Sequence, residues 1–490
     1  MANILNNFQK DEEGSINGVL TDREEIFIDD KELEKKLLRK MDFRIVPLLT
    51  FLYLLSFLDR VNIGNAKVAH IEDDIGLIGS QFNICLSIFF VGYILFEIPS
   101  NLILIKSSPS IWIPTTMVAW GIVMTLMAFV KNFSELMLAR FFLGVCESGL
   151  FPGVIYFITR WYKRSEQNFR IALFTVGNSF AGSFSGLLAY CILRLLGGKL
   201  NLKGWQWLFL VEGVVTIIVA ILAYFLISDY PEKTKWLSDE ERRFATERLK
   251  NDAGKAHVIQ FDKKQLFAAL KDWKVYLAML QLCTLSIPIY SFSLFLPTIV
   301  NGLGFDYVTS QLLSVPPFLC ASMSTLTVAI LSDRKLVRGP FIIMCSSFGI
   351  VGYILLGIPS SGVAVKYIGT CIVGIGIFPC LATSIAWLTN NIGGHVKRGI
   401  AAAMILMSGN LGGIIASQIY RPKDAPYYLF GHLLTATFLI IANFISILQY
   451  FLFKNINKKK RENPQSFLEG RSEEKIKNMG DLHPDFIYSL

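Results

Sequence analysis

Residues 45–66, IVPLLTFLYLLSFLDRVNIGNA, decide the fold of this chain. No charged residue occurs between Arg44 and Asp59. An α-helix needs about 20 mostly apolar residues to cross the roughly 30 Å hydrocarbon core of a bilayer. The stretch therefore predicts a transmembrane helix, and its Asp-Arg pair places two charges inside the span.

Eleven more apolar blocks of this length follow along the chain. The predicted spans are 45–66, 81–103, 111–130, 134–158, 170–193, 206–228, 275–299, 310–331, 340–358, 363–389, 400–420 and 428–453. A polar stretch divides them into two sets of six. The sequence thus predicts an all-α polytopic membrane protein, with twelve transmembrane helices in two six-helix lobes. Alternating ten-residue segments, which are typical of membrane barrels, do not occur.

The charge of the chain indicates its topology. Hydrophobic residues make up 53% of the sequence and charged residues only 17%, whereas soluble domains carry about 25%. The net charge of +9 does not indicate nucleic-acid binding, because basic clusters flank the first and last spans. Positive residues mark cytoplasmic flanks, so both termini are expected in the cytoplasm. These clusters are Lys35, Lys36, Arg39, Lys40 and Arg44, and Lys454, Lys458, Lys459, Lys460 and Arg461.

The same pattern predicts the domain boundaries. A cytoplasmic N-terminal tail over 1–44 has no cleavable signal peptide, so the first span is expected to act as its own insertion signal. A lobe over 45–228, a cytoplasmic linker over 229–274 and a second lobe over 275–454 follow, and a cytoplasmic tail covers 455–490. The simplest interpretation of the linker is a solvated tether.

Corresponding loops support an internal repeat. TRWYKRSEQNFR after span 4 and NNIGGHVKRG after span 10 are both basic and occupy matching positions. Pairs of glycines inside spans, which let helix backbones approach closely, predict tight helix packing. These pairs are Gly149 and Gly153, Gly182 and Gly186, and Gly409 and Gly413.

Several motifs resemble a known family. Asp333-Arg334-Lys335, with Arg338 four residues after Arg334, resembles the loop signature of the major facilitator superfamily. SFLDRVNIGNA, SIFFVGYILFEIPSN, ARFFLGVCESGLFPG and GNLGGIIASQIYRPKDAP resemble its anion:cation symporter branch, in particular the fungal allantoate and nicotinic acid permeases. The first-half counterpart of the loop signature departs from the pattern, with Ile105 and Lys106 where Asp-Arg is expected.

The resemblance implies a function. It implies a secondary active transporter that works by alternating access. The expected reaction is proton-coupled symport of a small organic carboxylate such as nicotinic acid. Allantoate, pantothenate, biotin and a dipeptide are the alternative cargoes. A nutrient sensor on the transporter fold, without transport, is the alternative class. The resemblance also implies a fungal plasma membrane, with the endoplasmic reticulum or the vacuole as alternatives, and a monomer.

Charges inside spans cost roughly 2.5–3.5 kcal/mol each on insertion scales, so they need partners or a function. Four such residues stand out: Asp59 and Arg60 in span 1, and Arg140 and Glu147 in span 4. Arg140 and Glu147 lie seven residues apart, on one helix face and about 10.5 Å apart along the axis. If spans 1 and 4 face each other, Asp59 is expected to pair with Arg140, and Glu147 with Arg60.

The resemblance assigns roles to these residues. Asp59 and Glu147 would be the proton-coupling sites, and Arg60 would hold the substrate carboxylate with its planar donor set. Arg140 would face the same cavity, and a static charge network is the alternative. Polar positions that would contact the substrate are Tyr93, Asn178 and Asn410, for which interhelical hydrogen bonding is the alternative. Weaker candidates are Tyr290, Ser293, Thr383 and Ser384, and Glu97 and Glu212 also lie in or near spans.

Other classes of chemistry lack support in the sequence. No GxxxxGK[ST] motif indicates ATP hydrolysis, and no nucleophile, base and orienting residue indicate an enzyme. The eight cysteines lie inside apolar blocks without a CxxC pair, so neither a disulfide framework nor a metal site is expected. We therefore expect no cofactor, no metal and no nucleic-acid partner. The expected partners are the lipid bilayer, protons and the carboxylate.

Overall fold

The structure is a computed structural model that describes residues 2–253, 263–335, 337–393, 395–469 and 479–490. Within these ranges every regular element is a helix. The α-helices of the first half are α1 (Ala2–Val68), α2 (Ile71–Asp74), α3 (Gln81–Lys106), α4 (Pro109–Met127), α5 (Phe133–Glu147), α6 (Leu150–Trp161), α7 (Arg164–Leu196), α8 (Gly204–Leu226) and α9 (Asp239–Ala253). Those of the second half are α10 (Lys263–Leu270), α11 (Trp273–Asn301), α12 (Tyr307–Leu313), α13 (Val315–Lys335), α14 (Gly339–Gly357), α15 (Val363–Asn390), α16 (His395–Ser417) and α17 (Leu429–Glu462).

The predicted spans correspond to these helices. Among the described residues, 11 helical stretches are long and apolar enough to cross a membrane. The remaining predicted span, 170–193, falls on α7, whose apolar part Phe180–Leu196 is shorter. Span 4 is formed by α5 and α6, which together run over Phe133–Trp161. The predicted all-helical fold class is confirmed.

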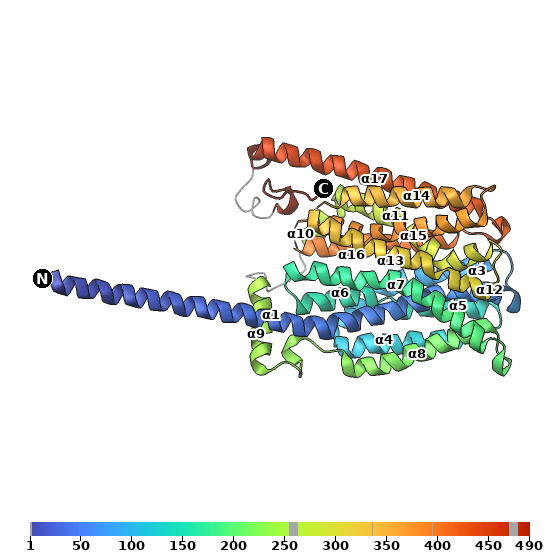
Figure 1. The fold of residues 1–490 in the computed structure, drawn as a ribbon, viewed down its shortest axis with the longest axis horizontal. Helices are drawn as coiled ribbons and strands as arrows, with labels where there is room; N and C mark the ends of the chain where they lie inside the picture. Colours follow the sequence, from blue (N-terminus) through green and yellow to red (C-terminus); the bar gives the residue numbers. More distant parts are fainter. Residues whose placement is uncertain (1, 254–262, 336, 394, 470–478) are drawn as a thin grey trace.

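The spans form two lobes. Figure 1 shows the helices of the first lobe, coloured blue to green, along one side of the bundle and those of the second lobe, yellow to red, along the other. In the N-lobe, α4 packs on α8, α3 on α5, and α1 on α7. In the C-lobe, α14 packs on α15, α11 on α16, and α13 on α15. The lobes meet where α7 contacts α13, α3 contacts α16, and α1 contacts α11.

The bundle has two different ends. We call the end that holds α9, α10 and the C-terminus the terminal end, and the opposite end, near α12, the far end (Figure 1). Toward the far end, Gln311 donates a hydrogen bond to the Asn65 carbonyl at 3.2 Å, and Asn83 donates one to the Tyr420 carbonyl at 3.0 Å. Within the described residues, the hydrogen bonds between lobes lie from the middle of the bundle to the far end.

Glycines permit this closure. A Cβ atom at Gly64 would lie 2.2 Å from the Leu294 carbonyl oxygen, so only glycine fits between α1 and α11. Cβ atoms at Gly182 and Gly186 would collide with α13 and α12, and one at Gly413 would lie 2.3 Å from the Phe90 ring. The predicted packing role is confirmed for Gly182, Gly186 and Gly413, whereas the close approach at Gly64 was not predicted. The three paired glycines among them lie between the two lobes.

The linker begins as part of the N-lobe. The Lys40 ammonium donates a 2.7 Å hydrogen bond to Glu241 on α9, and Arg248 on α9 donates one to Glu166 at 3.0 Å. The Trp161 and Trp236 rings stack with their centroids 5.6 Å apart. A solvated tether is therefore the wrong interpretation of this segment up to α9, because ion pairs and aromatic packing hold α9 against the terminal end of the N-lobe.

The C-terminal segment, residues 479–490, packs against the C-lobe in a similar way. Asp481 is buried and contacts Lys274 on α11, and it accepts a hydrogen bond from Lys397 at 2.9 Å. The Tyr488 ring stacks on Phe453 of α17 with centroids 5.0 Å apart. α17 also continues to Glu462, beyond the predicted lobe boundary at 454, because its basic residues extend the helix past the apolar span.

Candidate functional site

A buried ion pair connects α1 and α5 in the N-lobe. The Arg60 Nη2 lies 3.0 Å from Glu147 Oε2, and the same oxygen accepts a hydrogen bond from the Ser56 hydroxyl at 3.2 Å. The side chain of Arg60 is 6% exposed and that of Glu147 is fully buried. Glu147 Oε1 and Arg60 Nε have no hydrogen-bond partner among the described residues. The predicted pairing of Glu147 with Arg60 is confirmed, and it uses only part of what each group can bind.

Aromatic rings of α3 surround the guanidinium. The Arg60 Cζ lies 5.1 Å from the ring centroids of both Phe89 and Tyr93. Tyr93 is buried. An aromatic face attracts a cation, and more strongly where water is excluded. These rings orient Arg60 and shield it from water, which strengthens its attraction for an anion.

Asp59 faces away from this pair, into the N-lobe. Its Oδ2 accepts hydrogen bonds from Trp120 Nε1 of α4 at 3.1 Å and from the Thr216 hydroxyl of α8 at 2.9 Å. The predicted pairing of Asp59 with Arg140 is wrong in this conformation, since neither of Asp59's hydrogen-bond donors is an arginine. The adjacent residues Asp59 and Arg60 point to different sides of α1, which follows from the 100° turn per residue of a helix.

Arg140 is a fully buried cation without an ion pair. None of its three guanidinium nitrogens has a hydrogen-bond partner among the described residues. Its Cζ lies 4.8 Å from the centroid of the Phe89 ring, which Arg60 also contacts. Glu147 is close enough to act electrostatically on Arg140 but forms no ion pair with it, so Arg140 adds positive potential to the centre of the N-lobe.

The C-lobe contributes neutral polar groups on α11 and α16. The Tyr290 hydroxyl donates to Asn410 Oδ1 at 3.3 Å, and Asn410 Nδ2 donates across the lobe boundary to Glu97 at 3.5 Å. Tyr290 also packs edge-on against Phe90 with centroids 4.9 Å apart, and it lies within electrostatic range of Arg60. The buried site therefore has charged walls from one lobe and uncharged walls from the other.

Comparison with known proteins identifies the family. The sequence model of the Major Facilitator Superfamily matches residues 49–417. The chain belongs to the major facilitator superfamily.

Relatives within the superfamily are fungal transporters. An uncharacterised transporter of Schizosaccharomyces pombe is 36% identical over 94% of this chain and 91% of its own length. The high-affinity nicotinic acid transporter of Saccharomyces cerevisiae is 32% identical over 92% of this chain and 83% of its own length. The chain is thus a multi-pass membrane transporter of this superfamily, and the prediction that it is not an enzyme is confirmed.

A solved structure supports the fold. A D-xylose–proton symporter matches with a TM-score of 0.65 and 14% sequence identity, over 82% of this chain and 97% of that protein. A bacterial homologue of the human lysosomal transporter Spinster, in an inward-facing conformation, matches with a TM-score of 0.61 and 17% identity, over 82% of this chain and 96% of that one. At these identities the likeness establishes the superfamily fold alone.

The other predicted site residues have different outcomes. Asn178 lies on α7, and its side chain falls outside the described part of the chain. The hydroxyls of Ser293 and Ser384 are buried without a hydrogen-bond partner in the described residues, whereas Thr383 donates to the Pro379 carbonyl of its own helix. Glu97, for which the sequence predicts only a position in or near a span, is 6% exposed and contacts the opposite lobe. Its place beside Pro99 in the sequence gave no signal of this contact.

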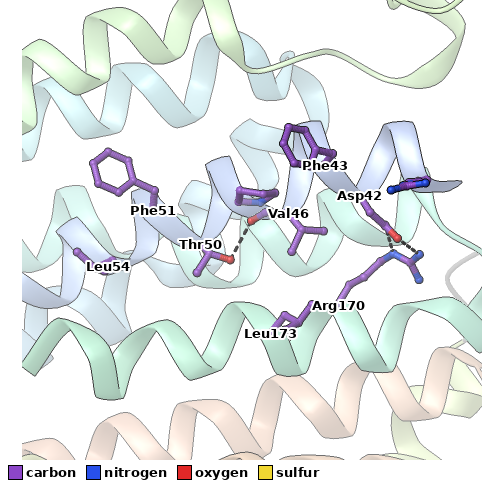
Figure 2. Close-up of a pocket in the computed structure, with 10 residues that line it drawn as sticks. Asp42, Phe43, Val46, Thr50, Phe51, Leu54, Arg170 and Leu173 are labelled. Carbon is purple, nitrogen blue, oxygen red and sulfur yellow. Dashed lines mark hydrogen bonds and ion pairs between the residues drawn. The ribbon is translucent and has the colours of Figure 1, made fainter. Parts of the chain in front are cut away.

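A separate pocket lies on the N-lobe nearer the terminal end. It has a volume of about 630 Å³ and lies between α1 and α7, with mostly apolar walls. Figure 2 shows the bidentate pair in its wall, in which Arg170 donates to both oxygens of Asp42 at 2.6 Å. Neither Arg60 nor Glu147 lines this pocket, so it is distinct from the buried site.

Proposed function

We propose that this transporter is a symporter that carries a small organic carboxylate together with protons, with nicotinic acid as the first candidate cargo. The observation that supports the proposal most directly is the Arg60–Glu147 ion pair beside the lobe boundary. A guanidinium presents a planar set of donors that matches a carboxylate in a bidentate geometry. Here Glu147 engages that set through a single nitrogen, so a ligand carboxylate in bidentate geometry can compete with Glu147 for Arg60.

Competition for Arg60 would couple the proton to the anion. A cargo carboxylate that binds Arg60 displaces Glu147 from its cation. An ionised carboxylate in a buried site is then unstable, and Glu147 takes up a proton. Glu147 loses its proton again when the cargo leaves and Arg60 becomes free. Proton binding and anion binding are thus mutually dependent, which is what symport requires.

The asymmetry of the two ends supports alternating access. Arg60 and Gly64 lie one turn apart on α1, so the site is next to the far-end closure at Leu294. Helix α16 shows the same arrangement. Asn410 lies at the site, where it donates to Glu97, and Gly413, one turn further along, lies at the lobe contact with Phe90. Movement of the two lobes about the site would open the far end and close the terminal end. With cytoplasmic termini, the closed far end is the external side, and this conformation faces inward.

Competition experiments test the cargo. The chain would be expressed in cells that lack related permeases. Uptake of labelled nicotinic acid would then be measured at about pH 5 and at about pH 7. We expect uptake that is faster at the lower pH, abolished by a protonophore, and inhibited by unlabelled nicotinic acid. Stronger inhibition by allantoate, pantothenate, biotin or a dipeptide would reassign the cargo. Uptake unaffected by any carboxylate, or by pH, would contradict the proposal.

Topology and location have a separate test. The basic clusters at both ends of the membrane part support cytoplasmic termini. The relatives are fungal, and we propose the plasma membrane as the first candidate location. We expect a glycosylation reporter fused after Leu490 to stay unglycosylated and a fluorescent fusion to mark the cell surface. Glycosylation of that reporter would reverse the topology, and fluorescence confined to the endoplasmic reticulum or vacuole would relocate the transporter.

A further inference from the structure

A second carboxylate lies beside Asp59 inside the N-lobe. Glu212 on α8 is 4% exposed, and neither of its carboxyl oxygens has a hydrogen-bond partner among the described residues. Thr216, one turn further along α8, donates its hydroxyl hydrogen bond to Asp59. Residues four apart lie on one face of a helix, so Glu212 and Thr216 both face α1. This arrangement places the Glu212 carboxyl next to Asp59.

Among the residues that the structure describes, no cation forms an ion pair with either of these two acids. Asp59 is the titratable group that acts electrostatically on Glu212, and Glu147 is the one that acts on Asp59. α4, which packs on α8, carries no Asp, Glu, Lys, Arg or His within its bounds. Charges on α7 lie near its ends, and among them Arg170 is paired with Asp42. The N-lobe thus holds Glu212, Asp59 and Glu147 in series, and Arg60 is paired with the last of them.

Electrostatics limits the charge of this pair. Two like charges repel strongly where water is excluded and the local dielectric constant is low. Burial adds a desolvation cost for each ionised carboxyl. Trp120 and Thr216 donate hydrogen bonds only to Asp59, so an ionised Asp59 has support that Glu212 lacks. The stable arrangement therefore keeps at least one proton on the two acids, in coupled titration.

We propose that Glu212 and Asp59 form a shared proton-binding site and that Glu212 is a third proton-binding residue of this transporter. One proton moves between a carboxyl oxygen of Asp59 and one of Glu212, and no other bond changes. Proton binding by the pair stands on its own geometry, whereas its part in symport rests on the proposed function. Asp59 accepts hydrogen bonds from α4 and α8, and the neighbouring Arg60 is paired with Glu147 of α5. Helix α1 therefore carries one residue of the shared proton site and one residue of the anion site.

Infrared spectroscopy tests proton binding without any cargo. Purified full-length protein in lipid vesicles would be titrated with acid while the carboxylic acid C=O band is recorded. We expect Glu212→Gln to move the titration midpoint of this band to lower pH by roughly one unit, because it removes the acid that holds its proton to higher pH and leaves Asp59, whose ionised form accepts two hydrogen bonds. Asp59→Asn should remove a titrating component. Glu240→Gln, an exposed position on α9, is the matched control and should leave the midpoint unchanged.

Transport measurements test the role of the shared site. In vesicles that contain Glu212→Gln, the pH profile of nicotinic acid uptake should shift to lower pH by the same amount, while counterflow of labelled for unlabelled cargo continues. Glu212→Asp keeps a carboxylic acid at this position, so its pH profile should resemble that of the wild type. This variant also provides the test if the glutamine variant does not fold. An unchanged infrared midpoint and an unchanged pH profile in Glu212→Gln would overturn the inference. An infrared shift in a protein whose wild type carries no nicotinic acid would leave the inference standing and remove the proposed cargo.

Discussion

The two lobes repeat one architecture but differ in what they bury. The middle of the N-lobe spans holds charged side chains, whereas the buried basic residues of the C-lobe lie near helix ends, as Lys274, Lys366 and Lys460 do. Toward the site the C-lobe presents neutral groups, with Tyr290 bonded to Asn410. Buried charged residues in the middle of the N-lobe include Asp59, Arg60, Glu97, Arg140, Glu147 and Glu212, whereas Lys67 and Arg170 lie nearer the ends of their helices.

This difference separates two tasks. Protons and an anion are recognised by charge, and the N-lobe holds ionisable groups close enough to influence one another. A neutral lobe cannot bind a proton, but its hydroxyls and amides can select the shape and polar groups of the cargo. In our proposal the N-lobe sets the coupling and the C-lobe sets the cargo. Substitutions in the two lobes should therefore have different consequences.

The largest effect is expected from Arg60→Lys. Lysine keeps the charge but loses the planar, two-pronged donor set, so uptake should fall roughly 100-fold, which corresponds to about 2.7 kcal/mol. Tyr290→Phe in the C-lobe removes one neutral hydrogen-bonding group, of about 1 kcal/mol, and should lower uptake only about 5-fold. Uptake kinetics and membrane abundance of both variants measure the difference. An unchanged half-saturation in Arg60→Lys would remove Arg60 from the binding site.

Glu147→Gln should separate binding from coupling. Glutamine has the shape of a protonated glutamate but cannot release a proton. Gradient-driven accumulation should therefore fall at least about tenfold, to the level of equilibration. Counterflow should continue, because exchange does not need the empty carrier to return with Glu147 ionised. Reconstituted vesicles allow both measurements side by side. Joint loss of accumulation and counterflow would favour a structural role for the ion pair, and retained accumulation would exclude the proton role.

The sequence predicted the fold more completely than the site. Apolar length and flanking charge are local properties, so the spans could be located, although α1, α7 and α17 extend beyond the predicted bounds as polar or charged helix. The Arg60–Glu147 contact followed from the requirement that charges inside spans find partners. The orientation of Asp59 could not be predicted, because it depends on which face of α1 meets Trp120 and Thr216. That choice is made by tertiary packing.

Two polar segments show the same limit at the terminal end. Residues 229–253 and 479–490 are polar in sequence, and polarity alone favours a solvated chain. In the structure, Trp236 stacks on Trp161 and Tyr488 stacks on Phe453, and ion pairs surround each contact. The sequence features that could have indicated these contacts were aromatic residues within charged segments, such as Trp236 and Tyr488. Their partners lie far away in the chain, so the contacts could not be derived from local pattern.

Closure of the far end should be sensitive to Gly64→Val. The new side chain would overlap the Leu294 carbonyl, so the variant should favour a conformation in which the far end is open. A Ser185→Cys reporter, whose hydroxyl position bonds to Asn65 in the closed state, should react with an impermeant maleimide about 3–10 times faster in this background. Gly362→Val is the matched control, because its Cβ meets nothing within 4 Å. Equal reactivity in the two glycine variants would show that the Gly64 contact does not control closure.

The smallest effects are expected at the terminal end, where acid should loosen the two lobes unequally. Burial acts to raise the pKa of the Asp272 carboxyl, but the hydrogen bond from Lys397 and the charge of Lys274 outweigh it and hold the pKa below 3.8. Burial likewise opposes the hydrogen bond from Lys40 at Glu241, whose pKa is held below 4.5. Because both folded-state values are the lower ones, each carboxylate stabilises the protein above its ordinary pKa. That contribution is lost as the pH falls through the folded value.

The two acids differ in burial, so their variants should differ in magnitude. The Asp272 side chain is 8% exposed and bonds to Lys397 at 2.6 Å, whereas the Lys40–Glu241 pair joins side chains that are 44% and 22% exposed. Exposed pairs contribute roughly 0–1 kcal/mol. At pH 7, Asp272→Asn should lower the melting temperature of the detergent-solubilised protein by about 2–4 °C, and Glu241→Gln by less than about 2 °C. Below the folded pKa values, each variant should melt like the wild type, because the wild-type carboxyls are then neutral too.

Equal shifts in the two variants at pH 7 would show that the C-lobe is not held more firmly at this end than the N-lobe. A difference that persists in acid would assign the effect of Asp272 to its capping of α11, where it accepts a hydrogen bond from the Lys274 amide, and not to its charge.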